Sequence, residues 1–429
     1  MKLRPGLVRS RLSPKAELYP QQPMKRKSFL TLLFLALVLA SAPLCAAQPA
    51  TQSATDPVTI PFELVTRHIV VKVRINDSRP LSFVFDTGDK VGVVDTDVAK
   101  DLGLKLDGQL RVGGAGADTL PGSFVKEANW SLPGLDGFSQ PVSIAIPLRR
   151  MAARAGHDFD GIIGSDFIRQ YVVEVDYQNR VLKLHDKDKF SYTGAGDIIP
   201  IQLNQMGYPL LDGEVTPANG EAIKGKFVLD LGSSGSLVLM SPVVTQHNLL
   251  GNGMKTIKAI GVGGAGGQSN GQIGRVRSLQ IGKFTIPNPI TLFSEDKAGA
   301  MATNQLVGNI GQLIAAKFKV FLDYSHTRII LEPNSTFAQP MDRATAGVVL
   351  TTEGKDYSIV RVMDVLENSP ASEAGIRKDD IVVSVDGQPA AELKATKIAE
   401  MFEKPATYKL TIRRGEQTLQ VPLTPRKLI

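Results

Sequence analysis

An internal duplication constrains the fold of this 429-residue chain more than any other feature of its sequence. Four short blocks recur in the same order, and Asp230 of the second set lies 144 residues after Asp86 of the first. Four ordered matches indicate two copies of a unit of roughly 130–150 residues. The matched blocks are FVFDTGDKVGVVD (83–95) with FVLDLGSSGSLVL (227–239), VGGAGAD (112–118) with VGGAGGQ (262–268), DGIIGSDFI (160–168) with QLVGNIGQL (305–313), and VEVDYQNRVLKL (173–184) with VFLDYSHTRIILEP (320–333).

The pattern within each copy is typical of β structure. From about residue 57, short apolar runs alternate with Gly, Asp, Asn and Pro turns. The first block predicts a strand ending at an Asp loop, the second a hairpin tip, the third a buried strand before one helical turn, and the fourth a hairpin. The separation of Asp86 from Gly164 equals that of Asp230 from Gly308, 78 residues in each copy. We therefore expect Gly164 and Gly308 to be matching second-strand glycines.

These blocks resemble the aspartic proteases, most closely the retropepsin-like branch, in which each lobe carries its own glycine-rich flap. The shared features are Asp-x-Gly after an apolar strand, Gly-Gly-x-Gly, and two apolar residues and a Gly before a short helix. The resemblance covers about residues 57–335. It implies a mainly β, two-lobed β-barrel pseudo-dimer on one chain, as in pepsins. Taken singly, Asp-Thr-Gly is also an ordinary turn and the glycine blocks are also ordinary hairpins.

The resemblance implies a catalytic pair, Asp86 and Asp230, one from each lobe. Two close carboxylates share one proton, so the ionised member can activate a water and the protonated member can polarise the substrate carbonyl. This chemistry needs no cofactor or metal. The remaining predicted site residues are loop supports (Thr87, Gly88, Gly232, Ser233) and flap glycines that would close over an extended substrate (Gly113, Gly114, Gly116, Gly263, Gly264, Gly266).

Two residues depart from the family pattern and leave a second function open. Leu231 stands where the family usually has a bracing Thr, and Asp89 adds a third carboxylate beside the pair unless Lys90 offsets it or it points to solvent. The leading prediction is an exported aspartic endopeptidase that cleaves peptides or unfolded protein segments. The alternative is a catalytically inactive peptide-binding protein of the cell envelope with the same fold.

After residue 340 the pattern changes, and residues 345–425 resemble a small α+β PDZ domain. The most specific stretch is SPASEAGIRKDDIVVSVDGQPA, with a short helix ended by Gly375 and a tight turn at Asp386-Gly387. PDZ domains bind extended peptides by strand addition, often through a terminal carboxylate. The residues around Gly347 and the run 357–360 are both candidates for the carboxylate loop. The alternative is a docking module that only supports the lobes.

The N-terminal segment predicts export. MKRK (24–27) precedes the apolar run SFLTLLFLALVLASAP and a small-residue site that allows cleavage after Ala47. We expect residues 1–47 to be an extension plus signal peptide, and a periplasmic or cell-envelope location. A retained leader or lipidation of Cys45, the one cysteine, would add membrane contact. The predicted domains are thus 1–47, a first lobe at 57–190, a second lobe at 196–335 and the PDZ domain at 345–425.

The basic charge of the chain belongs to this leader. Of 49 Lys/Arg and 42 Asp/Glu, eight basic residues and one acid lie in residues 1–27, which leaves 41 of each. A nucleic-acid partner therefore loses its main support.

Three other signals would compete with the aspartic-protease interpretation. GVGGAG (261–266) matches a dinucleotide fingerprint but lacks a following helix. LGSSGS (231–236) echoes a serine-nucleophile loop, yet no motif places any of the five histidines beside it, and their scatter argues against a metal site.

Overall fold

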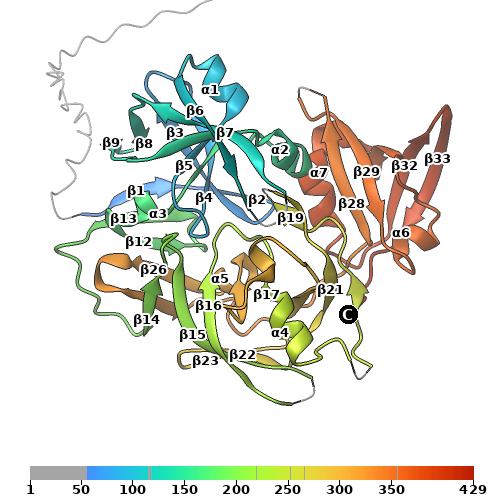
Figure 1. Ribbon diagram of the computed structural model, residues 1–429. Coiled ribbons are helices and arrows are strands. Elements are labelled where there is room, and N and C mark those ends of the chain that lie inside the picture. The colour runs from blue at the N-terminus through green and yellow to red at the C-terminus, as the bar shows by residue number, and fades with distance from the viewer. Residues whose placement is uncertain are drawn as a thin grey trace, which may run out of the picture. The chain divides into compact units, whose positions relative to one another are not determined.

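The computed structural model describes residues 56–429 except Ala115, Ala117, Asn219, Asn252, Ala265 and Lys355. The leader at 1–47 and Cys45 lie outside the described residues, so the expectations for them stay predictions. The described chain is mainly β, as predicted (Figure 1). Among residues 56–429, no helix is both long enough and apolar enough to cross a lipid bilayer.

The first repeat is built on a sheet in the order β6-β7-β10-β5-β11-β4-β3-β8-β9, with β2 paired to β3. Its central pair is parallel, β4 (Leu81–Phe85) with β11 (Gly161–Ile163), and every residue of both strands is buried. Continuous apolar runs suit strands buried on both faces. The other elements are β2 (Glu63–Val65), β3 (His68–Ile75), β5 (Gly92–Asp95), α1 (Thr96–Asp101), β6 (Lys105–Val112), β7 (Leu120–Lys126), β8 (Trp130–Leu132), β9 (Leu135–Phe138), β10 (Ser143–Ile146), α2 (Arg149–Ala155) and α3 (Ser165–Ile168).

The two repeats are joined by strand pairing between their last hairpins. Strand β12 (Tyr171–Asp176) pairs antiparallel with β26 (Phe318–Asp323), so that Val173 faces Leu322. These strands belong to a sheet that continues through the second repeat, in the order β1-β13-β12-β26-β27-β14-β15-β16-β25-β17-β24-β21-β18. At one edge of this sheet lie β1 (Val58–Pro61) and then β13 (Val181–Asp186), and β27 (Arg328–Pro333) lies between β26 and β14. One hydrophobic core runs through both repeats.

The second repeat copies the arrangement of the first. Strand β16 (Ile223–Leu229) lies parallel to β25 (Gly308–Ile310), as β4 does to β11. Its other elements are β14 (Asp197–Leu203), β15 (Pro209–Thr216), β17 (Leu237–Leu239), α4 (Ser241–Gln246), β18 (Ile257–Lys258), β19 (Gly263–Gly264), β20 (Gly267–Gln268), β21 (Gly271–Arg275), β22 (Ser278–Ile281), β23 (Phe284–Pro287), β24 (Ile290–Ser294), the 3-10 turns at Ala300–Ala302 and Tyr324–His326, and α5 (Gln312–Ala315).

The strand register corrects the predicted match between Gly164 and Gly308. Phe83 pairs with Gly161, and its counterpart Phe227 pairs with Gly308. Gly164 follows its strand as the N-cap of α3, a position that Gly311 holds for α5. The sequence comparison was therefore offset by three residues, because G-I-I-G and G-N-I-G present a glycine at both ends.

The C-terminal segment forms a separate sheet with its own core, in the order β28-β29-β30-β32-β33, with β31 paired to β30. Gly375 has the positive φ of a residue that ends a helix, and Asp386-Gly387 forms the predicted turn. The elements are β28 (Val348–Glu353), β29 (Ile359–Val365), α6 (Pro370–Glu373), β30 (Ile381–Val385), β31 (Gln388–Pro389), α7 (Ala390–Met401), β32 (Tyr408–Arg414) and β33 (Gln417–Leu423).

Candidate active site

Each candidate catalytic aspartate directly follows a buried strand. The Asp86 N–H donates to Ile163 O (3.0 Å), and the Asp230 N–H donates to Ile310 O (2.9 Å). These two acceptors hold matching places on β11 and β25. Parallel pairing therefore fixes both aspartates at the carboxyl ends of equivalent strands, and the joined hairpins bring the two ends together.

The glycine after each aspartate loop lies against the opposite carboxylate. A Cβ atom added to Gly88 would lie 2.8 Å from Asp230 Oδ1, and one added to Gly232 would lie 2.1 Å from the Asp86 carboxyl carbon. Within each loop, the Gly88 N–H donates to Asp86 Oδ1 (2.6 Å) and the Gly232 N–H to Asp230 Oδ1 (2.9 Å). Both positions require glycine because no side chain fits between the loops.

Asp86 and Asp230 also share a side-chain hydrogen bond, and their electrostatic environments differ. Burial raises the pKa of Asp86 well above its ordinary value, and the charges of Asp230 and Asp89 raise it further. Burial raises the pKa of Asp230 too, but hydrogen bonds from Asn309, Gly232 and Ser233 oppose that rise. The pair therefore favours a proton on Asp86 and a charge on Asp230.

Asn309 supplies the side-chain part of this asymmetry, and the sequence analysis missed it. Its side-chain amide donates to Asp230 Oδ2 at 2.6 Å. Its counterpart in the first repeat is Ile162, since Val84 pairs with Ile162 and Val228 with Asn309. The signal was a polar residue in an otherwise apolar strand, and it appears only when G-I-I-G is matched with G-N-I-G.

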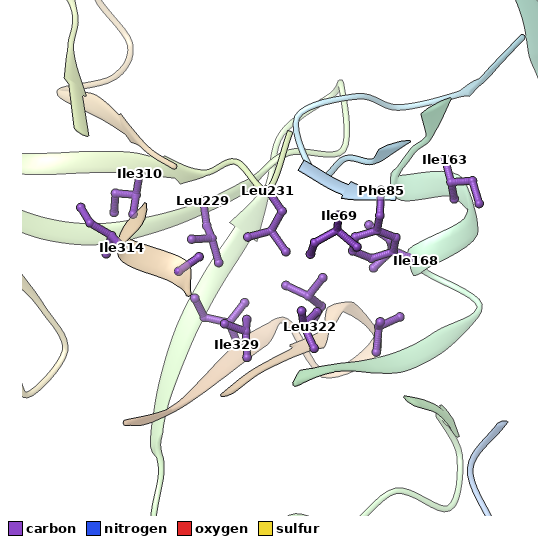
Figure 2. Packing of buried hydrophobic residues seen from close by; sticks show 14 of the residues in the cluster. Ile69, Phe85, Ile163, Ile168, Leu229, Leu231, Ile310, Ile314, Leu322 and Ile329 are labelled. Atoms are coloured by element: carbon purple, nitrogen blue, oxygen red, sulfur yellow. The ribbon is translucent and has the colours of Figure 1, made fainter. Parts of the chain in front are cut away.

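Thr87 braces the two loops as predicted for this position. Its hydroxyl donates to Leu229 O (2.6 Å) and accepts from the Leu231 N–H (2.8 Å). Leu231 cannot return the contact, and its side chain is instead fully buried in the core beside Leu229, as Figure 2 shows. Thr87 therefore contributes a side chain to the hydrogen bonds between the two loops, and Leu231 contributes only its backbone.

A second bond network holds the Leu231 loop from the other side. Gln312 Nε2 donates to Leu231 O (2.6 Å), and the Tyr177 hydroxyl donates to Gln312 Oε1 (2.5 Å). Both side chains are buried. Tyr177 comes from the first repeat and Gln312 from the second, so this network also crosses between the lobes. Neither residue was predicted, because neither lies in the Asp-x-Gly motif.

Asp89 lies close enough to the pair to influence it. Burial raises the pKa of Asp89 to about 6, although the backbone N–H groups of Lys90 and Val91 favour its charged form. The Lys90 ammonium donates to Gln205 O (3.4 Å) rather than to this carboxylate. Burial and the charges of Asp89, Asp86 and Asp230 raise the pKa of Tyr208, so its neutral phenol is a further group near the site.

The two predicted flaps touch each other. The Asp118 N–H donates to Gly266 O (2.8 Å), and a Cβ atom on Gly116 would lie 2.1 Å from the same oxygen. Gly263 and Gly264 form strand β19, which pairs with β20 in a short hairpin, and Gly114 lies beside Gly266. Gly113, by contrast, is open, with no atom within 4 Å of its added Cβ.

The geometry does not provide a serine-type triad among the described residues. His68 does lie near Gly232 of the LGSSGS loop, a proximity that no motif predicts, but its Nδ1 contacts Thr66 Oγ1 (3.0 Å) and Val65 O (3.3 Å) rather than a serine of that loop. Ser325, His326 and Asp323 cluster in one turn, yet the same His326 Nδ1 faces both partners. A triad needs the two ring nitrogens on different partners.

Within residues 56–429, apart from the six positions excepted above, no group of three His, Cys, Asp or Glu side chains could hold a metal ion.

Comparison with known proteins identifies two domains. Residues 71–167, which include Asp86, match the family model described as "Aspartyl protease", and residues 345–424 match the "PDZ domain" model. Curated relatives include Serine protease HTRA1 of Xenopus laevis, 30% identical over 67 residues, and Serine protease HTR4 of Rattus norvegicus, 35% identical over 66 residues. These matches cover 16% and 15% of this chain and 14% and 13% of the relatives, so the chain spans about one seventh of the length of the relatives it matches. The chain contains an aspartyl protease domain and a C-terminal PDZ domain.

Proposed function

We propose that this protein is an exported aspartic endopeptidase that cleaves peptides or unfolded protein segments. The observation that carries the proposal is the reciprocal packing of the two loops. Gly88 lies against Asp230, Gly232 lies against Asp86, and the two carboxyls share a hydrogen bond. Two buried carboxyls side by side raise the free energy of the folded state, because like charges repel each other. Such pairs are therefore concentrated at functional sites.

The asymmetry of the pair assigns the two roles. Asp230, with Asn309 and two loop N–H groups on its oxygens, is the carboxylate that takes a proton from the attacking water. The water oxygen then forms a bond to the carbonyl carbon, while Asp86 gives its proton to the carbonyl oxygen. Transfer of the proton on Asp230 to the amide nitrogen allows the C–N bond to break and regenerates that carboxylate. One hydroxyl proton of the collapsing intermediate returns to Asp86, so the carboxylic acid product forms and the starting protonation of the pair is restored.

The named relatives are serine proteases, but the matches to them do not bear on the aspartate pair. A 67-residue match cannot span Asp86 and Asp230, which lie 144 residues apart. Those matches support a protease linked to a PDZ domain in general terms. The aspartic type is supported by the hydrogen-bonded carboxyls and by the family match that includes Asp86.

The leader supports export to a periplasm or cell envelope, where unfolded segments would be the substrates. The PDZ domain supports peptide binding, and we assign it the selection or presentation of substrate.

The second candidate is an inactive peptide-binding envelope protein. It is favoured by Leu231, which leaves one half of the brace unmade, and by Asp89, which adds negative charge beside the pair. The first candidate is preferred because Gln312 and Tyr177 hold the Leu231 loop by other means.

The test is cleavage of denatured casein across about pH 3 to 8 by the mature protein and by Asp86→Asn and Asp230→Asn variants. Asp212→Asn is the matched control, since that carboxyl is exposed and pairs with Lys226. We expect losses of at least about 10³-fold in both dyad variants and none in the control. Cleavage that persists in both variants removes the dyad, and casein binding without cleavage by the unmodified protein supports the second candidate.

A further inference from the structure

The PDZ sheet ends in an edge of the kind that binds peptides in PDZ domains. Strand β28 is the outermost strand of its sheet, and β29 is its strand partner among the described residues. Helix α7 packs near this edge, as Figure 1 shows. A free strand edge beside a helix is the place where PDZ domains add an extended peptide as a new strand. Gly347, with φ +72°, turns the chain into β28 and marks one end of this groove.

The other end of the groove is filled by the protease domain itself. The Thr352 hydroxyl on β28 donates to Ala153 O of α2 at 2.6 Å, and Thr352 is buried. Gly156 caps α2 with φ +62°. A Cβ atom on Gly156 would lie 3.2 Å from Thr352 Cγ2 and 3.5 Å from Ala395 Cβ of α7. Gly156 therefore sits between the strand and the helix that together form the groove.

Contacts on either side extend this docking. The Tyr357 hydroxyl donates to Asp158 Oδ1 at 2.9 Å, just beyond Gly156. On the second repeat, Val349 of β28 lies 2.7 Å from the point where a Cβ on Gly261 would be. Gly261 precedes the flap hairpin β19–β20, whose neighbour Gly266 touches the first flap. The PDZ edge thus holds the α2 segment and the base of a flap together.

The groove helix is distorted at the point of contact. Lys394 has φ +63° and ψ 158°, inside α7, next to the Ala395 that touches Gly156. This backbone region is sparsely populated for residues with a side chain, and such conformations persist where the surroundings impose them. The Lys394 ammonium donates to Asp356 O (2.8 Å), in the same loop as Tyr357. The distorted part of α7 is therefore the part that contacts Gly156.

We propose that residues 153–158 of the protease domain occupy the far half of the PDZ groove, so that a long peptide ligand must displace them and thereby free the base of the second flap. Thr352 lies five residues after Gly347, or about 16 Å along the strand. A ligand whose carboxylate lies at Gly347 would extend roughly four residues before it met Gly156. Short ligands would fit beside the docked segment, whereas longer ones compete with it. The predicted effect on the flap rests on the proposed protease function. The predicted occupation of the groove by residues 153–158 does not.

A disulfide test addresses the occupancy directly. In full-length protein with Cys45→Ser, Gly156→Cys and Ala395→Cys place two Cβ atoms at the 3.5 Å separation of the present contact, which suits a disulfide. Gly156→Cys with Thr418→Cys is the matched control, because β33 lies at the opposite edge of the sheet. We expect oxidation to cross-link the first pair at least about tenfold faster than the control. Equal rates would overturn the docking.

Two further arms test displacement and its effect. An equimolar mixture of decapeptides with free carboxyl ends in Val, Leu, Ile or Phe should slow cross-linking at least about threefold, and tetrapeptides with the same ends should slow it less. An unchanged rate with the decapeptides rules out competition. The cross-linked protein should cleave casein at least about fivefold more slowly than the same sample after reduction. Equal cleavage in both states refutes the flap effect, whereas no cleavage by any form, including the unmodified chain, argues against the protease function and leaves the first two arms to decide the docking.

Discussion

Asn309 donates a 2.6 Å hydrogen bond from its side-chain amide to Asp230 Oδ2, and this contact has no counterpart at Asp86. The two repeats place equivalent strands behind both aspartates, so the backbone is nearly symmetric while the chemistry is not. In a fully symmetric pair, neither carboxyl would be favoured as the charged member. In this protein the Asn309 amide and the Ser233 N–H favour the charge on Asp230. The charge of Asp89 favours a proton on Asp86.

Replacing Asn309 with Ile, the residue of the first repeat, should reduce this asymmetry. Without the amide donor, the pKa of Asp230 rises, because burial is no longer opposed by this hydrogen bond. We expect the acidic limb of the kcat/KM profile to move to higher pH and the rate to fall about 10- to 100-fold at the acidic end. Asn179→Leu is the control, since Asn179 makes a similar 2.9 Å bond to Asp176, a carboxylate outside the pair. An unshifted profile in Asn309→Ile would refute the assignment of Asp230 as the charged member.

The raised pKa of Asp86 predicts a stability effect with a definite sign. A carboxyl whose pKa is higher in the folded state binds its proton more tightly there, so it stabilises the fold at low pH and that contribution is lost as pH rises through the folded pKa. Asp86→Asn removes the charge that must otherwise be buried at high pH. We expect its melting temperature at pH 8 to exceed that of the unmodified protein by at least about 2 °C, with a smaller difference at pH 4. Calorimetry at both values is the measurement, and a larger gain at pH 4 would contradict burial of the ionised carboxylate as the cause.

The sequence predicts site residues well where they lie in one contiguous motif, and poorly where they are brought together from distant segments. Asp86 and Asp230 stand at strand ends because Asp-x-Gly follows an apolar run, and local pattern alone indicates that. Gly164 and Gly308 were mismatched because only strand register separates two equally good alignments. Gln312 and Tyr177 reach the Leu231 loop from distant segments, so no spacing rule could find them. The contact of Gly156 with Thr352 and Ala395 lies between domains and leaves no local trace.

The one-sided brace at Thr87 predicts a large cost for losing its hydroxyl. Thr87→Val leaves Leu229 O and the Leu231 N–H without this partner in a fully buried place. Burying such groups unpaired costs about 1–3 kcal/mol each, so we expect a loss of about 2–6 kcal/mol in the free energy of unfolding. Thr87→Ser keeps both hydrogen bonds and loses one methyl group, for about 1 kcal/mol. Urea titration of the three proteins distinguishes the outcomes, and equal losses in the two variants would mean that packing, rather than hydrogen bonding, is what Thr87 supplies.

The contact between the flaps can be tested with two alanine substitutions that differ only in their surroundings. Gly116→Ala places a methyl group 2.1 Å from Gly266 O, so the flaps must move apart and the bond from the Asp118 N–H to that oxygen must lengthen or break. Gly113→Ala meets no atom within 4 Å and should change little. Hydrogen exchange at the Asp118 amide reports the difference without any need for activity, and we expect it to speed up about tenfold or more in the first variant alone. Equal exchange in both variants would mean that the flaps are already apart in solution, and the hydrogen bond between them would then have no role in holding the site closed.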